Sequence, residues 1–259
     1  MSKRNSTADG VTMEESLDIM VRKGSAERFH VAYIMHTPVM YDYLSAGFLF
    51  SEGIIRSRSD LLGFEGFDSN GVSVKNSLTV LVADDLPLNL KEMQRQFFVN
   101  SSCGICGKAN INEIFMRTSG LQRSECTIHA ETILQLPKIM REYKSIFSKT
   151  GGIHAASLFS LQGKIMALAK DIGRHNAVDK IVCYMLLNGL INHDLALQVS
   201  GRVGFEIAQK EAIAGFPIIT STSAPSSLAV ETCETLGLTL AWFVREDRLS
   251  IYSIGQRIL

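Results

Sequence analysis

The chain has 259 residues, with 26 basic and 26 acidic side chains and therefore no formal net charge. Apolar residues make up 46% of the chain and charged residues 20%, which is typical of globular proteins and excludes a disordered chain. The charge balance argues against a dedicated nucleic-acid-binding protein, because such proteins normally carry a basic excess. The length fits one large domain or two modest ones.

The five cysteines are too few, and odd in number, for a secreted disulfide framework. The first ten residues are polar and lack the apolar core of a signal peptide. No apolar run approaches the roughly 18 residues that a membrane helix needs. We therefore expect a cytoplasmic protein with reduced thiols that binds neither membranes nor nucleic acid.

The first part of the chain predicts a mixture of strands and helices. Partial alternation of apolar and polar residues over 16–22 and 29–35 indicates half-buried strands. A shared apolar face predicts a helix over 40–53, and 72–83 reads as one strand or two. Small, polar and glycine residues over 99–108 predict a loop.

From residue 131 the pattern becomes helical up to Gly151, with Pro137 marking either the first turn or a kink. Short apolar runs then alternate with helical stretches, which predicts an α/β layer structure within a chain that is α+β overall. We place a domain boundary near 130, between an N-terminal α+β region (1–130) that ends in a cysteine loop and an α/β domain (131–259). The strands are expected at 153–160, 165–169, 195–200, 217–221 and 238–244, and the helices near 175–189, 204–214 and 226–236.

Three of these strands lead through a short polar turn into a helix. Ligands of open α/β sheets bind outside the carboxyl ends of the strands, and helix N-termini attract anions. The turns carry cations, hydroxyl groups and glycines that would let a ligand approach the backbone. The cations are Arg174, His175, Lys180 and Arg202, the hydroxyl residues Ser200, Thr222, Ser223, Ser226 and Ser227, and the glycines Gly173, Gly201 and Gly204.

The alternative explanation for each turn is helix capping, for which Ser, Thr and Asn are the usual residues. Three such turns, two of them with cations, favour a cradle for a large anion such as a nucleotide or dinucleotide. Neither a GxGxxG fingerprint nor a P-loop is present, so a standard Rossmann or P-loop site is excluded.

Cys103 and Cys106 form a CxxC pair among small residues, and a thiolate there would be reactive. The pair fits a redox site, a persulfide carrier or, with Cys126 and His129, a structural zinc site. His129 and Glu131 match the H-x-E element of zinc deaminases, but the CxxC of those enzymes lies downstream and here it lies upstream. The residues alone leave the zinc and persulfide hypotheses open.

The assembled motifs resemble the FdhD/NarQ family of formate dehydrogenase accessory sulfurtransferases. The matching segments follow one another in the family's order and cover most of the chain. They are TPVMYDYLSAGFLFSEGII (37–55), SSCGICGKANI (101–111), TGGIHAASLF (150–159), DIGRHNAVDK (171–180), SGRVGFEIAQK (200–210), SAPSSLAVE (223–231) and GLTLAWFVREDRLSIYS (237–253). The sequence departs from the family at Lys170, where an acidic residue is common.

The resemblance implies a C-terminal domain similar to cytidine deaminase, a three-layer α/β/α sandwich without the deaminase zinc, beside a smaller mixed N-terminal domain. It implies that a cysteine desulfurase donates sulfur to the CxxC as a persulfide. The sulfur would pass to the molybdenum cofactor, in its bis(molybdopterin guanine dinucleotide) form, before that cofactor enters the catalytic subunit of formate dehydrogenase. A homodimer is consistent with the family.

Mapped onto this chain, the resemblance makes Cys103 the persulfide carrier and Cys106 its partner. The family's cofactor-binding stretch maps to residues 243–248. The cations of the three turns would suit the pyrophosphates of the cofactor. No resident metal is expected. The alternative hypothesis is a zinc-stabilised chaperone that delivers the cofactor without sulfur transfer. The cofactor-binding set is Phe243, Val244, Arg245, Glu246, Asp247, Arg248, Arg174, His175 and Arg202.

Overall fold

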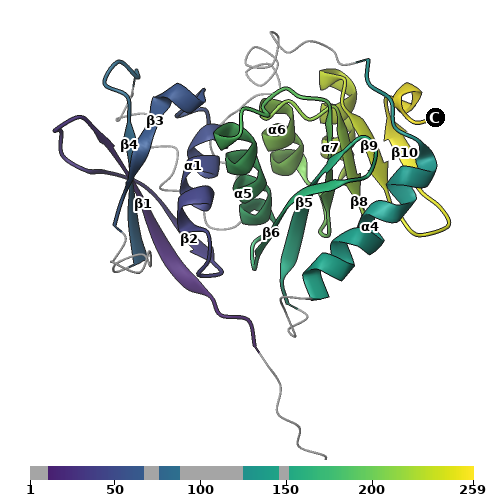
Figure 1. Ribbon diagram of the computed structural model, residues 1–259, viewed down its shortest axis with the longest axis horizontal. Helices are drawn as coiled ribbons and strands as arrows, with labels where there is room; N and C mark the ends of the chain where they lie inside the picture. Colours follow the sequence, from purple (N-terminus) through teal and green to yellow (C-terminus); the bar gives the residue numbers. More distant parts are fainter. Residues whose placement is uncertain (1–10, 67–75, 88–124, 146–151) are drawn as a thin grey trace, which may run out of the picture.

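The computed structural model describes residues 11–66, 76–87, 125–145 and 152–259. The first part of the chain forms a four-stranded sheet in the order β2-β1-β4-β3 (Figure 1). In it β1 pairs antiparallel with β2 and parallel with β4, and β3 pairs antiparallel with β4. The strands are β1 (Glu15–Lys23), β2 (Phe29–His36), β3 (Leu61–Glu65) and β4 (Ser77–Val82), and the helices are α1 (Tyr41–Ser51) and the short η1 (Arg58–Asp60).

The second part forms a six-stranded sheet in the order β10-β9-β8-β7-β5-β6. Its core strands β7, β8 and β9 are parallel, because the helix after β7 and the helix after β8 each return the chain to the opposite edge before the next strand begins. The strands are β5 (His154–Ser160), β6 (Ile165–Asp171), β7 (Leu195–Val199), β8 (Ile218–Ser221), β9 (Thr239–Trp242) and β10 (Ser250–Ser253). The helices are α4 (Ala130–Ser145), α5 (Arg174–Leu187), α6 (Phe205–Ile213), α7 (Ser227–Leu236) and the short η3 (Gly255–Arg257).

Alternate residues of this sheet enter two different apolar cores. Phe159, Ala196, Ile218 and Ala241 lie in the core that contains Ile133 and Leu136 of α4. The neighbouring residues Leu158, Leu197, Ile219 and Leu240 lie in the core formed with α5, α6 and α7. Because successive strand residues point to opposite faces, both faces are covered, and the predicted three-layer α/β/α arrangement is confirmed.

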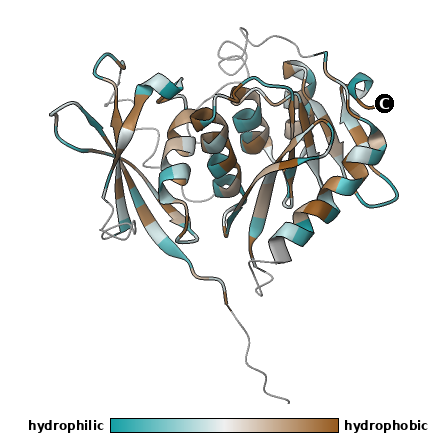
Figure 2. Cartoon of the chain, in the orientation of Figure 1, coloured by the Kyte–Doolittle hydropathy of each residue, from teal (hydrophilic) through white to brown (hydrophobic). Residues whose placement is uncertain are grey.

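The helix α1 connects the two sheets, since it lies between the first sheet and α5 (Figure 1). Gly47 allows the close contact: a Cβ at this position would lie 1.8 Å from the backbone oxygen of Asp179 in α5. One apolar core contains Leu17 and Val80 of the first sheet, Leu44 of α1 and Ile181 of α5. Figure 2 shows the hydrophobic residues along these inner elements and the hydrophilic ones on the outer loops.

Most predicted elements are present within one to three residues of the expected ends. The prediction missed β3 and β10. Pro137 lies inside α4, which starts at Ala130, so it does not mark the first turn. Trp242, Cys183 and Cys233 are buried in the core. Within the described segments, no helix has the length and apolar character needed to cross a membrane.

Candidate functional site

The carboxyl ends of four strands meet at one edge of the six-stranded sheet. β7, β8 and β9 are parallel, and β6 runs in the same direction because β5 is antiparallel to both β6 and β7. The three predicted turns and the segment 243–248 follow these four strands. The structure therefore brings the three predicted turns and the predicted cofactor-binding stretch together. We call this set of turns the ligand edge.

Hydrogen bonds connect the turns of the ligand edge to one another. The Thr222 hydroxyl donates to the backbone oxygen of Ser200 (3.3 Å), and the Ser221 hydroxyl donates to that of Gly201 (2.8 Å). The Arg245 guanidinium donates to the backbone oxygen of Thr222 (2.7 Å). The backbone N–H of Val244 donates to the oxygen of Ser221 (3.1 Å). The turns after β7, β8 and β9 thus form one connected surface.

The helices of the ligand edge begin in two different ways. α7 is capped by its own sequence, because the Ser226 hydroxyl accepts a hydrogen bond from the N–H of Ala229 (3.2 Å). α5 and α6 begin after Gly173 and Gly204, which have no side chain that could cap them. Capping therefore accounts for Ser226, whereas the start of α6 keeps backbone N–H groups for an anion.

The cations of the ligand edge differ in what balances their charge. Arg174 and Arg202 have no ion-pair partner among the described residues, and the Nε of Arg174 is buried without a hydrogen bond there. Arg248 lies 3.3 Å from Asp247, and both side chains are exposed. Arg245 is used by the fold, since it donates to backbone oxygens. Arg174 and Arg202 are the cations best placed for a phosphate.

His175 is held by a residue that the sequence analysis did not select. Its Nε2 lies 2.9 Å from Oε2 of Glu206 in the first turn of α6, and both side chains are about one-quarter exposed. The hydrogen bond from His175, with the positive charges of His175, Arg174 and Lys210, lowers the pKa of Glu206. Glu206 belongs to the SGRVGFEIAQK motif, but its role depends on α5 lying beside it.

The segment after β9 presents its residues in different directions. Phe243 has a left-handed backbone (φ 50°), which costs about 1–2 kcal/mol for a non-glycine residue, and its side chain is 39% exposed. Val244 is buried in the core beside α4 and can offer a ligand only backbone atoms. Glu246 forms an exposed ion pair with Arg141 of α4 (3.0 Å).

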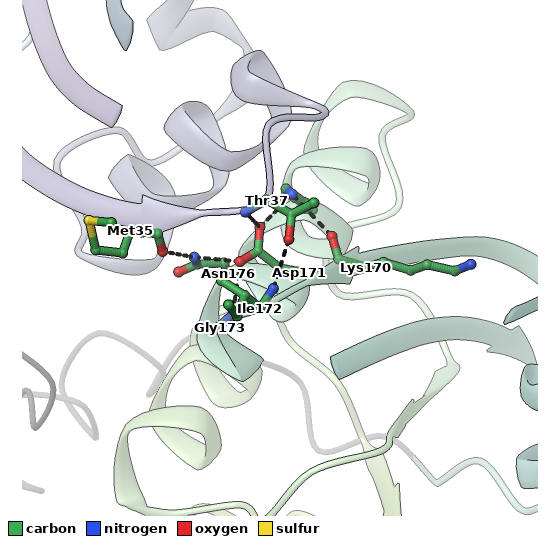
Figure 3. A network of polar contacts seen from close by, with 8 residues as sticks. Met35, Thr37, Lys170, Asp171, Ile172, Gly173 and Asn176 are labelled. Atoms are coloured by element: carbon green, nitrogen blue, oxygen red, sulfur yellow. Dashed lines mark hydrogen bonds and ion pairs between the residues drawn. The ribbon is translucent and has the colours of Figure 1, made fainter. Parts of the chain in front are cut away.

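Lys180 is not a ligand-binding cation, contrary to the sequence interpretation. It is fully buried, and its Nζ lies 2.6 Å from Asp171 Oδ2 (Figure 3 shows the surrounding contacts). The Oδ1 of the same carboxylate accepts hydrogen bonds from the N–H of Gly173 and from Asn176 Nδ2, each at 2.8 Å. Burial lowers the pKa of Lys180, and Asp171 offsets only part of that effect. We call these residues the Asp171 cluster.

Two of the three selected glycines are explained by packing rather than by a ligand. A Cβ at Gly173 would lie 2.8 Å from Asn176 Nδ2, and one at Gly201 would lie 3.0 Å from Nδ1 of His154 and 3.4 Å from Cβ of Arg174. Around Gly204, in contrast, nothing lies within 4 Å of such a Cβ. Gly204 is therefore the position where a ligand can approach the backbone.

Cys103 and Cys106 lie outside the described residues. Cys126 is half-buried, and His129 is exposed. The described segments contain no cluster of three or more potential metal ligands. Since the zinc hypothesis needs the CxxC as well, it stays a prediction, as does the role of the CxxC itself.

Comparison with known proteins shows which family the chain resembles. Residues 12–259 match the FdhD/NarQ family. A protein of Thermoplasma volcanium named sulfur carrier protein FdhD is 49% identical over 97% of this chain and 90% of its own length. The protein of the same name from Picrophilus torridus is 44% identical over 99% of this chain and 94% of its own.

The fold is also found in solved structures. Among them is a protein from Desulfotalea psychrophila that is named a formate dehydrogenase accessory protein, with a TM-score of 0.71. The alignment covers 95% of this chain and 90% of that one, at 22% identity. The match over almost the whole chain, and relatives above 40% identity, show that this protein belongs to the FdhD/NarQ family.

Proposed function

We propose that this protein is a cytoplasmic sulfurtransferase that carries sulfur for the maturation of formate dehydrogenase. Its sulfur comes from a cysteine desulfurase and is held as a persulfide on Cys103. The acceptor is the bis(molybdopterin guanine dinucleotide) molybdenum cofactor, which binds as a substrate before it enters the catalytic subunit of formate dehydrogenase. The protein works as a homodimer.

The sulfur steps balance with a desulfurase persulfide as donor, the two cysteines and a thiol reductant. The Cys103 thiolate attacks the terminal sulfur of the desulfurase persulfide, and the desulfurase thiolate leaves. Attack of the Cys106 thiolate on Cys103 Sγ then forms a disulfide and expels the terminal sulfur as sulfide, so the two thiols supply both electrons. A thiol reductant must regenerate the pair.

The observation that carries the cofactor part of the proposal is the convergence of four turns on the ligand edge, with Arg174 and Arg202 lacking carboxylate partners among the described residues. The cofactor contains two pyrophosphates, and guanidinium groups beside helix N-termini suit such anions. The relatives named sulfur carrier protein FdhD support the sulfur part. Neither observation favours the zinc chaperone.

The first experiment measures intact mass under non-reducing conditions after incubation with a cysteine desulfurase and cysteine. Wild-type protein should gain sulfur that a reductant removes, and Cys103→Ala should gain none. If wild type gains no sulfur while zinc is retained in the native spectrum, the sulfurtransferase proposal is wrong and the zinc-stabilised chaperone is favoured.

The second experiment measures binding of guanosine diphosphate, the nucleotide half of the proposed cargo, by calorimetry. Arg174→Ala and Arg202→Ala should each weaken binding at least ten-fold, since a charge-assisted hydrogen bond contributes about 1.5–3 kcal/mol. Arg28→Ala is the matched control, because this exposed arginine lies in the β1–β2 turn. Unchanged affinity in both variants would contradict the placement of the cofactor site.

A further inference from the structure

The TPVMYDYLSAGFLFSEGII motif is the longest matching segment to which the proposed function assigns no role. Its first residue, Thr37, lies between β2 and α1 and contacts the turn between β6 and α5, about 135 residues away in the sequence. That turn leads directly into Arg174 and His175 of the ligand edge. The contact therefore joins the N-terminal sheet to the predicted nucleotide site.

The contact is reciprocal. The Thr37 hydroxyl accepts a hydrogen bond from the N–H of Ile172 (3.0 Å), and the N–H of Thr37 donates to Asp171 Oδ2 (3.3 Å). Asn176 Nδ2 adds a third link by donating to the backbone oxygen of Met35 (2.9 Å). Figure 3 shows these bonds converging from the two segments. Each segment thus satisfies polar backbone groups of the other.

The start of α5 depends on this contact because its own sequence does not cap it. The N-cap residue is Gly173, and its N–H is bonded by Asp171 rather than by a capping side chain of the helix. The same carboxylate also accepts a hydrogen bond from the buried Lys180 (2.6 Å), so Asp171 is held from both sides of the turn. The side chains of Arg174 and His175 make no hydrogen bond within the Asp171 cluster.

We infer that Thr37 is a positioning residue for nucleotide binding: its contact with Ile172 and Asp171 fixes the turn that orients Arg174 and His175. This inference rests on the proposed binding of a guanine nucleotide at the ligand edge. If the turn adopts other arrangements, affinity falls by the fraction of molecules in which the cations are misplaced. The side chain of Thr37 itself does not need to touch the ligand.

The test compares Thr37→Val, which keeps the shape but loses the hydroxyl, with Thr37→Ser, which keeps it. Thr37→Val should weaken guanosine diphosphate binding about five-fold, the size expected from the loss of one hydrogen bond, and Thr37→Ser should stay within about two-fold of wild type. Amide hydrogen exchange over residues 172–175 should become faster in Thr37→Val only.

Ser51→Ala is the matched control at the other end of α1. The Ser51 hydroxyl donates to Asp179 Oδ1 (2.7 Å), so this variant loses one buried hydrogen bond between α1 and α5, whereas Thr37→Val loses one between the segments that precede these helices. Ser51 lies away from the turn. Ser51→Ala should lower the melting temperature about as much as Thr37→Val, with neither the loss of affinity nor the faster exchange.

Two results would overturn the inference. In the first, Thr37→Val keeps the affinity and the exchange rates of wild type. In the second, Ser51→Ala changes affinity and exchange as much as Thr37→Val does, which would indicate a general loosening of the fold. If wild-type protein itself binds no guanosine diphosphate, the proposed nucleotide site is wrong. Positioning of the turn by Thr37 is then decided by the exchange measurement, where equal rates in Thr37→Val and wild type reject it.

Discussion

The Asp171 cluster and the ligand edge meet at the turn between β6 and α5 and use the same kinds of residues, but they differ in what balances each charge. In the cluster, Lys180 and Asp171 are fully buried and satisfy each other. At the edge, Arg174 and Arg202 have no carboxylate partner among the described residues. The difference teaches that a cation in a motif indicates a ligand only where the fold gives it no partner.

The largest effect is expected from breaking the buried pair. Asp171→Asn leaves the Lys180 ammonium buried without a counter-charge, and breaking such a pair costs about 3–5 kcal/mol. Urea denaturation should show this loss in the free energy of unfolding. Removing both charges in Asp171→Asn/Lys180→Met should recover much of it, because apolar residues can replace a buried pair. A loss below about 1 kcal/mol in the single variant would show that the cluster is not structural.

A second test concerns the α1–α5 contact on which the cluster depends. Gly47→Ala would place a Cβ 1.8 Å from the backbone oxygen of Asp179, so the helices must separate. Overpacking of this kind costs about 1–3 kcal/mol, and we expect the upper end because the obstacle is backbone. Gly204→Ala is the control for chemical denaturation: its Cβ has open space and its φ of −94° suits alanine. Equal stability of the two variants would contradict the close contact.

The sequence predicts the ligand edge well because strands that alternate with helices place their carboxyl ends together, whatever the details of packing. It could not predict the role of Lys180. That role depends on Asp171 being buried by Thr37, a contact between segments about 135 residues apart. The pairing of His175 with Glu206 was missed for the same reason, since it requires α5 and α6 to lie side by side.

The two missed strands also have a physical explanation. Three of the four residues of β10 are exposed, and β3 is a short edge strand that contains Gly63. Neither strand has the alternating burial from which a strand can be recognised. Long-range pairing, with β9 for one and β4 for the other, defines them instead.

The titration of His36, which lies near Asp171 and Lys180, tests the surroundings of the Asp171 cluster without removing a residue of the cluster. His36 is fully buried and packs edge-on against Tyr41 (ring centroids 4.9 Å apart). Burial lowers the pKa of His36 below 6.5, and Lys180 acts in the same direction, whereas Asp171, the backbone of Thr37 and Glu15 oppose it.

Because the unfolded chain then binds the proton more readily, the unfolding free energy should be highest above about pH 6.5 and fall at lower pH. One proton limits the slope to about 1.4 kcal/mol per pH unit. The contribution levels off below the folded-state pKa. Urea unfolding between pH 8 and pH 5 should show a shallower fall for His36→Phe than for wild type. Parallel curves would mean that His36 does not titrate in this range.

The smallest effect separates two arginines within the ligand edge itself. Arg245 donates to the backbone oxygens of Thr222 (2.7 Å) and Val244 (3.0 Å), whereas Arg202 is exposed and makes no ion pair with the described residues. Arg245→Ala should therefore lower the unfolding free energy by about 0.5–1 kcal/mol, and Arg202→Ala should leave it unchanged within about 0.5 kcal/mol.

Binding of guanosine diphosphate should weaken in both variants, in Arg245→Ala through a displaced turn and in Arg202→Ala through a lost charge. Raising the salt concentration should reduce the effect of Arg202→Ala more, because screening acts on an exposed charge and little on the turn geometry. Equal salt dependence in the two variants would show that the presence of a protein partner does not distinguish structural from ligand-binding cations at this edge.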